Sequence, residues 1–525
     1  MAVGTALSRV TGLGRLAAAA FALGVTESRV ADTYNIANTL PNVIYELVLG
    51  GVLTGVFIPV VVEELRTKEK GEAWEAVSSL VMTAMAVLVA ISLVAIVAAP
   101  AVIRLFTLRL SGAEAQEQQE LATFFLRVFA PQIALYGYAA ISAALLNAHD
   151  RFGVPMFVPI LNNLVVIAVF LVFAATAGGD PTAAGVNADF GAKFLLAAGT
   201  TAGVAAMALA NWPAVRKLPG RLRPILAFRH PAVRKLGRLS LWTLGYVVSN
   251  QISFGIALVL ANGVQGGPTA YFTAFTFFQL PYGIAAVSIM TALVPTLSAQ
   301  YVDQDDAGFR ARTAGGLRAM ALLMIPATAA FILLSRPLIR VLLQHGVMGA
   351  ASSRLVASTL DLLALGLLPF SAFLLLVRAF YARQDTRTPL VVNVVSNTVY
   401  LIASFALFGP LDVRGLALAH TICYVTAAVL AAYMLAKRVG GLESAKTVRE
   451  LTKTVFASLA SATVMLAALW FASAFARGDA RAVLQLVLGG GAGLVTFVAA
   501  ARALRIEDLA TFGRLLPRKL RGLTG

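Results

Sequence analysis

The stretch "LVMTAMAVLVAISLVAIVAAPAVI", residues 80–103, carries no charged side chain and decides the fold class of this chain. At about 1.5 Å per residue, a helix of this length crosses the ~30 Å hydrocarbon core of a bilayer. A helix also pairs its own backbone N–H and C=O groups, which lipid cannot do. The stretch therefore predicts a transmembrane helix.

Similar apolar runs recur along all 525 residues, of which 59% are hydrophobic and only 13% are charged. A soluble protein has about twice that charged fraction. We therefore expect an all-α polytopic membrane protein with about fourteen spans. The expected spans are 1–24, 33–61, 77–103, 120–147, 154–177, 192–212, 236–262, 268–298, 312–343, 355–380, 389–409, 413–436, 452–475 and 482–503.

The distribution of basic residues predicts the orientation of the chain. If the amino terminus is cytosolic, 31 of the 42 Lys and Arg residues lie on the cytosolic side and 10 lie outside, with Arg127 left within a span. This asymmetry follows the positive-inside rule, so both termini are expected in the cytoplasm and the chain in the plasma membrane. The net charge of +17 then reflects topology and not nucleic-acid binding.

The spacing of prolines indicates an internal duplication, since proline kinks a helix at a fixed place. Pro41, Pro59, Pro100, Pro131 and Pro155 are separated by 18, 41, 31 and 24 residues, and Pro281, Pro295, Pro337, Pro369 and Pro389 by 14, 42, 32 and 20. We infer two six-helix lobes, 1–215 and 236–437, related by a pseudo-two-fold axis along the membrane normal. Parallel repeats of this kind build transporters.

Two segments fall outside the duplication. The basic stretch 216–238 contains eight Lys and Arg residues and no acidic residue, so we expect an amphipathic inter-lobe linker that lies along anionic lipid headgroups. Residues 438–525 contain the last two spans and a basic cytosolic tail.

Several kinds of chemistry are not expected. Cys423 is the only cysteine, and the four histidines are far apart in sequence with no metal-ligand spacing. The chain has no phosphate-binding loop of the Walker type, and its outside loops are short and poor in carboxylates. We therefore predict no metal site, no cofactor and no enzymatic activity, and we disfavour a glycan polymerase, a ligase or a passive scaffold.

The two arginines on the first span are candidates for ligand binding. A charge at the bilayer centre costs at least ~2.5 kcal/mol, so such a charge usually has a function. Arg9 and Arg15 are six residues apart, about 9 Å along a helix. A guanidinium grips phosphate oxygens in pairs, so we predict a site for a phosphate-bearing substrate. The alternative is that both arginines only anchor the helix at the cytosolic headgroups.

Other polar residues within the spans have two interpretations each. Glu46, in the second span, is expected to contact the substrate or a proton, or to pair with an arginine of the first span. Asn393 and Asn397 share a face of one span and, with Asn250 on another, are consistent with a cation site or with hydrogen bonding between helices.

Six motifs in order resemble one known family. They are "SRVTGLGR" (8–15), "ADTYNIANTLPN" (31–42), "GGVLTGVFIP" (50–59), "NAHDRFGVPMFVPILNN" (147–163), "LPYGIAAVSIMTALVPTLS" (280–298) and "YARQDTRTP" (381–389). Together they resemble the MurJ (MviN) family of bacterial lipid II flippases, within the multidrug/oligosaccharidyl-lipid/polysaccharide exporter superfamily.

The resemblance implies fourteen helices, a central cavity and a final helix pair that lines a groove for a polyprenyl tail. It implies a substrate-binding set made of Arg9, Arg15, Asp32, Asn42, Glu46, Thr276 and Gln279. Three positions depart from the family pattern: Leu16 replaces an acid, Tyr45 and Glu46 replace basic residues, and Thr276 replaces an arginine. The cavity is therefore expected to be less positive than in much of the family.

The expected function is translocation of lipid II, an undecaprenyl-pyrophosphate disaccharide-pentapeptide, by alternating access during peptidoglycan synthesis. The alternative is export of another polyprenyl-linked glycan or of a drug on the same scaffold. The expected energy source for transport is a Na⁺ gradient, a H⁺ gradient or the membrane potential. Expected partners are lipid II, anionic lipids at the linker and other proteins of cell-wall synthesis.

Overall fold

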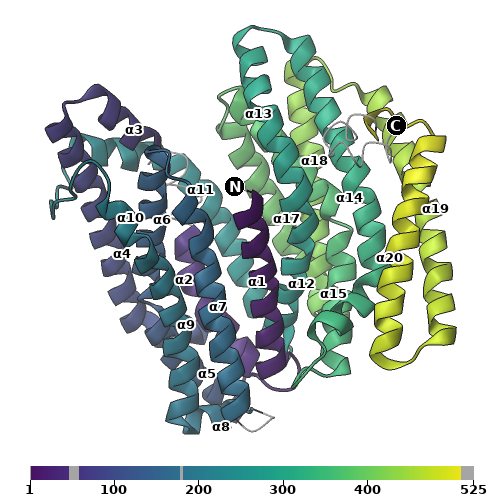
Figure 1. The fold of residues 1–525 in the computed structure, drawn as a ribbon, viewed down its shortest axis with the longest axis horizontal. Helices are drawn as coiled ribbons and strands as arrows, with labels where there is room; N and C mark the ends of the chain where they lie inside the picture. Colours follow the sequence, from purple (N-terminus) through teal and green to yellow (C-terminus); the bar gives the residue numbers. More distant parts are fainter. Residues whose placement is uncertain (1, 47–57, 178–180, 510–525) are drawn as a thin grey trace. The chain divides into compact units, whose positions relative to one another are not determined.

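The computed structural model describes residues 2–46, 58–177 and 181–509, and these form helices joined by turns, without strands (Figure 1). The chain divides into two compact units. The first contains residues 1–269 with 345–349, and the second contains residues 270–344 with 350–525.

The first unit contains eleven described helices. They are α1 (Ala2–Leu23), α2 (Val30–Glu46), α3 (Ile58–Thr67), α4 (Lys70–Phe106), α5 (Gly112–Phe129), α6 (Gln132–Ala148), α7 (Gly153–Thr176), α8 (Ala183–Ala188), α9 (Phe190–Ala210), α10 (Trp212–Arg216) and α11 (Pro231–Ala261). Helix α1 packs along α7, which in turn packs on α9.

The described helices of the second unit run from α12 to α20, and α12 begins three residues before the unit boundary. They are α12 (Gly267–Pro281), the π-helix η2 (Tyr282–Ala286), α13 (Val287–Val302), α14 (Asp306–Leu343), α15 (Ala350–Ala364), α16 (Leu367–Ala382), α17 (Arg387–Leu411), α18 (Val413–Val439), α19 (Ser444–Phe475) and α20 (Gly478–Ala503). The hairpin α19–α20 packs against α14.

The helices agree with the all-α membrane fold that hydropathy predicts. Among the described residues, ten helices are long and apolar enough to cross a membrane, and the pair α15–α16, bent by 49°, makes an eleventh. The other three expected spans correspond to α1, to α2 with α3, and to α11. The second of these is incomplete here, because residues 47–57 lie outside the described part.

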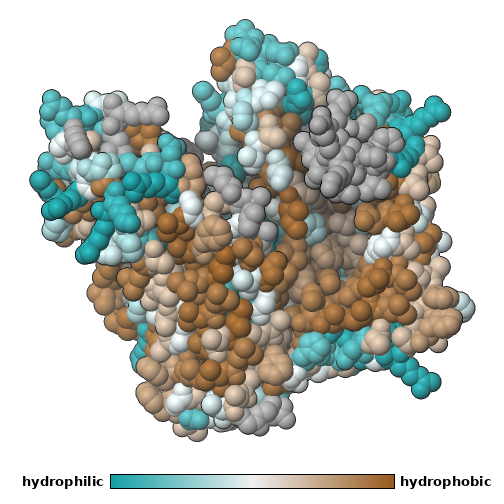
Figure 2. Space-filling view, viewed as in Figure 1, coloured by the Kyte–Doolittle hydropathy of each residue, from teal (hydrophilic) through white to brown (hydrophobic). Residues whose placement is uncertain are grey.

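The surface has the character of a membrane protein. On the face drawn in Figure 2, apolar side chains cover the middle of the helices and hydrophilic side chains gather at the helix ends. Large apolar side chains such as Val97, Trp470 and Phe475 are more than 70% exposed. Water would disfavour such exposure, whereas lipid tails solvate these groups.

Prolines interrupt some helices and not others. Pro131 stands between α5 and α6, Pro281 precedes the π-helix, and Pro369 lies in the first turn of α16 after the 49° bend. Pro100 and Pro337 lie inside continuous helices. The duplication inferred from proline spacing stays a prediction, since the two compact units describe packing and their boundary at residue 269 falls after α11.

The basic linker is irregular over residues 217–230 and lies against α4. Leu218 is buried in one cluster with Trp74, and the Arg223 amide donates to Ser78 Oγ (3.0 Å). Leu226 and Phe228 are at least 60% exposed beside exposed arginines. This mixture of apolar and basic side chains supports the expected contact with lipid headgroups, which stays a prediction.

The motif "YARQDTRTP" forms the turn before α17. Asp385 accepts hydrogen bonds from the amides of Arg387 and Thr388 (both 3.0 Å), which are donors at the helix start that otherwise lack partners. Arg438, at the end of α18, pairs with the Asp385 carboxylate and donates to Thr388 Oγ1 (2.8 Å). The motif thus fastens the start of α17 to the end of α18.

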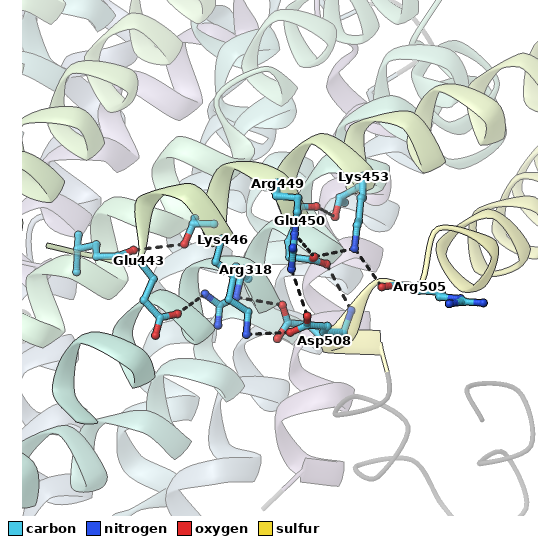
Figure 3. Close-up of polar contacts among 12 residues, drawn as sticks. Arg318, Glu443, Lys446, Arg449, Glu450, Lys453, Arg505 and Asp508 are labelled. Atoms are coloured by element: carbon cyan, nitrogen blue, oxygen red, sulfur yellow. Dashed lines mark hydrogen bonds and ion pairs between the residues drawn. The ribbon is translucent and has the colours of Figure 1, made fainter. Parts of the chain in front are cut away.

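A network of charged residues joins α14 to the last helix pair (Figure 3). Arg318 of α14 is buried and pairs with Glu443 (2.9 Å) and with Asp508 (3.4 Å). The buried carboxylate of Glu450 in α19 pairs with Lys453 (2.8 Å). Burial raises the pKa of the Asp508 carboxyl even though Arg318 lies beside it. The network therefore ties the segment after α20 to α14 and α19.

Replacing Arg318 by alanine should destabilise the second unit by about 2 kcal/mol, because it leaves two carboxylates without their shared cation. The measurement is the thermal midpoint of the purified protein in detergent. Arg310→Ala is the control, since Arg310 donates only to the Gly440 carbonyl at the surface (3.0 Å). Equal midpoints for both variants would show that the network does not stabilise the unit.

Candidate functional site

The two predicted arginines lie on α1, which is one continuous helix. Arg9 is half-buried and Arg15 is exposed. The helix that carries them contacts α7 and α2 of the same unit. Within the part of the chain described, which leaves out the side chain of Glu46, neither arginine forms an ion pair with an acidic residue. Their contact with substrate stays a prediction.

Helix α1 is held in place by α7. The side-chain amide of Asn163 donates to Thr11 Oγ1 (3.0 Å) and to the Ser8 carbonyl (3.3 Å). A methyl group at Gly12 or Gly14 would meet Asn163 or Ile167 at ordinary contact distance. These glycines therefore face α7 in this conformation, and α1 runs through them without a break.

Asp32 occupies a different environment from the one expected of a substrate ligand. Its side chain is fully buried at the start of α2. It accepts hydrogen bonds from the Gly266 amide (2.7 Å), the Thr269 amide (3.1 Å) and the Thr269 hydroxyl (2.7 Å). Both carboxylate oxygens therefore accept hydrogen bonds from residues at the start of α12 or just before it, and contact of Asp32 with substrate stays a prediction.

Arg29 extends this cluster toward α5. It is buried, pairs with Glu114 and donates to the Asn262 carbonyl (3.0 Å). The Asn262 side chain exchanges hydrogen bonds with Gln118 of α5 and donates to the Phe106 carbonyl (3.1 Å). The segment 262–269 is thus bound from both ends to the first helices of the chain.

Glu27, in the turn between α1 and α2, holds a second distant segment. It accepts hydrogen bonds from its neighbour, the Val25 amide (2.7 Å), and from the Gly349 amide (2.8 Å). The Val347 amide donates to the Phe21 carbonyl (3.0 Å). Gly346 has a positive φ of 61°, and a Cβ there would lie 2.5 Å from that carbonyl oxygen, so only glycine fits.

The other predicted residues of α2 are partly described. Asn42 is half-buried, and its amide donates to the Asn38 carbonyl (2.8 Å) within the helix. Glu46 is the last residue of α2, but its side chain and that of Tyr45 lie outside the described residues. The roles predicted for Asn42 and Glu46 therefore stay predictions.

Thr276 and Gln279 lie on α12 in the second unit, one helical turn apart. Both side chains are exposed, and the Thr276 hydroxyl donates to the Phe272 carbonyl (2.9 Å). Residues three apart share one face of a helix, so the two side chains point the same way. The structure thus brings these two together and leaves their polar groups accessible.

The predicted cation ligands divide between the units. Asn393 and Asn397 are buried on α17, and the Asn397 amide donates to Asn393 Oδ1 (3.1 Å). Asn250 is half-buried on α11 in the other unit. The described residues contain no group of three or more His, Cys, Asp or Glu side chains able to hold a metal ion. The cation site stays a prediction.

The sequence analysis missed two features of the site. Glu27 and Arg29 lie in a short turn next to Asp32, and the signal was the run of charges between the first two spans. Arg378 of α16 is the second feature. It was counted with the cytosolic residues, although it lies inside the expected span 355–380.

Comparison with solved structures shows the fold. A structure described as a lipid II flippase MurJ in an inward closed conformation has a TM-score of 0.76 and 20% identity, and the alignment covers 96% of this chain and 99% of that one. An inward-facing multidrug transporter of the MATE family has a TM-score of 0.68 and 15% identity, over 84% and 99% of the two chains.

Comparison with curated sequences gives the family. The chain is 29% identical over 412 residues to the lipid II flippase MurJ of Burkholderia cenocepacia, covering 76% of each protein. It is 26% identical over 482 residues to the probable lipid II flippase MurJ of Haemophilus influenzae, covering 89% of this chain and 90% of that one. The family model of the lipid II flippase MurJ matches residues 19–485. The chain therefore belongs to the lipid II flippase MurJ family.

Proposed function

We propose that this chain translocates lipid II from the cytosolic to the outer leaflet of the bacterial plasma membrane. The observation that carries the proposal is the family match over residues 19–485. The exposed guanidinium of Arg15 on α1 supports it, because it forms no ion pair among the described residues and a guanidinium binds phosphate oxygens well. The polar head of lipid II cannot cross ~30 Å of hydrocarbon unaided.

In this proposal, Arg9 and Arg15 neutralise the pyrophosphate while the head is inside the protein. Arg presents a planar fork that forms paired hydrogen bonds with phosphate oxygens, which the Lys ammonium cannot do. The exposed pair Thr276 and Gln279 offers hydrogen-bonding groups for the sugar or peptide part of the head.

We further propose that the contacts of Glu27, Arg29 and Asp32 belong to a conformation that is closed on the outer side. They hold the segments 262–269 and 345–349 against the turn between α1 and α2. Release of the head to the outside then requires these hydrogen bonds to break. The closed state must be only a few kcal/mol more stable than the open one if the two are to exchange.

The driving force is a separate proposal. The membrane potential acts on each substrate charge with ~2.3 kcal/mol per 100 mV, and an inside-negative potential moves an anion outward. Coupling to Na⁺ through Asn393 and Asn397, or to H⁺ through Glu46, are the alternatives.

The alternative function is export of another polyprenyl-linked glycan or of a drug. The fold is similar to that of the MATE transporter, so the fold alone does not distinguish this alternative from lipid II transport. Lipid II is distinguished from these substrates by complementation of a strain depleted of its lipid II flippase. Growth of the depleted strain on the wild-type chain supports lipid II transport, and continued lysis at normal membrane abundance excludes it.

The same strain tests the arginines. Arg15→Ala should abolish growth, whereas Arg15→Lys should retain only part of the activity, because charge is kept and the planar fork is lost. Lipid II export is measured at matched membrane abundance. Arg104→Ala is the control, since Arg104 lies exposed at the end of α4. Full activity of both Arg15 variants would show that Arg15 does not bind substrate and only anchors α1 at the lipid headgroups.

The proposed orientation places both termini in the cytoplasm. Single cysteines at two exposed positions, Ala184 of α8 and Ala445 of α19, test it in a Cys423→Ala background. An impermeant thiol reagent applied to intact cells should label Ala184→Cys and spare Ala445→Cys until the cells are opened. The reverse labelling pattern would invert the topology.

Asp32→Ala should loosen the segment 262–269, because it leaves the Gly266 and Thr269 amides without their acceptor. An unsatisfied buried donor costs about 1–3 kcal/mol, so amide exchange of a peptide covering this segment should accelerate about tenfold or more. Asp189→Ala is the control, since Asp189 accepts from the Ala192 amide (3.1 Å) at the start of α9 only. Unchanged exchange in the Asp32 variant would show that the closed contacts are not populated in solution.

A further inference from the structure

Arg378 is a charged residue inside an apolar helix, and no part of the proposed mechanism uses it. It lies in α16 within the sequence "LLLVRAFYA", residues 374–382, four residues before the helix ends. Its neighbours Val377 and Ala379 are buried, whereas the Arg378 side chain is exposed. The side chain therefore leaves the helix packing and points to a surface that is open within this unit.

That surface is a cavity of about 320 Å³ in the second unit. Its lining consists of Tyr282, Val287, Met290, Thr291, Val294, Pro295 and Arg378. The lining also contains the hydroxyl groups of Tyr282 and Thr291, of which the Thr291 hydroxyl donates to the Val287 carbonyl (2.8 Å), and the remaining lining is apolar. This composition fits an amphipathic anion better than a free inorganic ion, which would leave the apolar wall in water.

The opposite wall of the cavity is shaped by the π-helix. Residues 282–286 follow Pro281 and continue into α13, which supplies Val287, Met290 and Thr291. A π-helix inserts an extra residue into the helical repeat, and such insertions occur often at functional sites. The Thr291 side chain is exposed and belongs to the cavity lining, and its hydroxyl oxygen can still accept a hydrogen bond.

Two acidic residues near the end of α16 are already paired with other cations. Asp306 pairs with Arg383 (2.8 Å), and Asp385 pairs with Arg438. In the residues that the structure describes, Arg378 takes part in no ion pair. A guanidinium at the edge of hydrocarbon with no internal counter-charge favours an external anion.

We infer that Arg378 binds the pyrophosphate of a polyprenyl-pyrophosphate lipid, while the apolar lining of the cavity contacts the first isoprene units. The inference rests on the proposed function and deepens it, since it adds an anion site in the second unit to the arginines of α1. The shared chemistry is a lipid phosphate, and the alternative source is the headgroup of an ordinary anionic phospholipid near the helix end.

The test measures lipid binding to the purified full chain in phosphatidylcholine nanodiscs. The probes are undecaprenyl pyrophosphate, lipid II and phosphatidylglycerol, each added to wild type, Arg378→Ala and Arg378→Lys. Arg312→Ala is the matched control, because Arg312 is an exposed arginine of the same unit outside the cavity. Thermal midpoints check that every variant is folded. If Arg378→Ala is not folded, Arg378→Lys is used for the comparison with wild type.

We expect Arg378→Ala to weaken the binding of undecaprenyl pyrophosphate and lipid II by at least tenfold, as for loss of a charge-assisted hydrogen bond. The affinity of Arg378→Lys should lie between those of wild type and Arg378→Ala, and the affinity of Arg312→Ala should equal that of wild type. Wild-type affinity in Arg378→Ala overturns the inference and leaves lipid II transport standing. If Arg378→Ala weakens the binding of phosphatidylglycerol by the same factor, the inference is also overturned, because Arg378 then only binds headgroups of ordinary anionic lipids.

The two proposals fail in different ways. If wild type binds undecaprenyl pyrophosphate through Arg378 but does not bind lipid II, the inferred site stands and the proposed substrate is wrong. If wild type binds neither pyrophosphate lipid, both are wrong.

Discussion

A charged side chain in hydrocarbon needs a partner, and this constraint organises the charges of the described residues. Arg29 pairs with Glu114 at the edge of the apolar region, and Asp361 accepts a hydrogen bond from Ser335 within it. Arg15 and Arg378 instead keep exposed side chains in helices that are otherwise apolar. The first two contacts stabilise the fold, whereas in our proposals the two arginines, which form no ion pair among the described residues, bind an anionic substrate.

Hydropathy and length predict the helices well, because lipid leaves the backbone no alternative to local hydrogen bonding. The expected span 154–177 and the helix Gly153–Thr176 differ by one residue at each end. The same reasoning cannot predict where a span breaks. Pro369 marks the 49° bend between α15 and α16, whereas Pro337 leaves α14 continuous, since neighbouring helices decide whether a kink is relieved.

The candidate site is predicted less completely from the sequence than the helices are. Residue type and position identified Arg15 and Asp32 as unusual, because polar groups in a span are rare. Their surroundings could not be predicted, since Asp32 bonds to Gly266 and Thr269, more than 230 residues away, and sequence spacing carries no information about that approach. For Asn393 and Asn397 the sequence predicts a shared helix face, and the structure shows a hydrogen bond between the two side chains along that face, which the sequence analysis did not specify.

The way in which Glu27 and Asp32 hold their distant segments affects how the chain tolerates mutation. In most of these contacts the donors are backbone amides, of Gly266, Thr269 and Gly349, and only the acceptors are side chains. The contacts that use only backbone amides therefore do not depend on the side chains of the held segments, whereas those of Asn262, Gln265 and the Thr269 hydroxyl do. The acceptors Glu27 and Asp32 are close together in the chain, so these two carboxylates are a better guide than the held segments to whether a relative can make the same contacts.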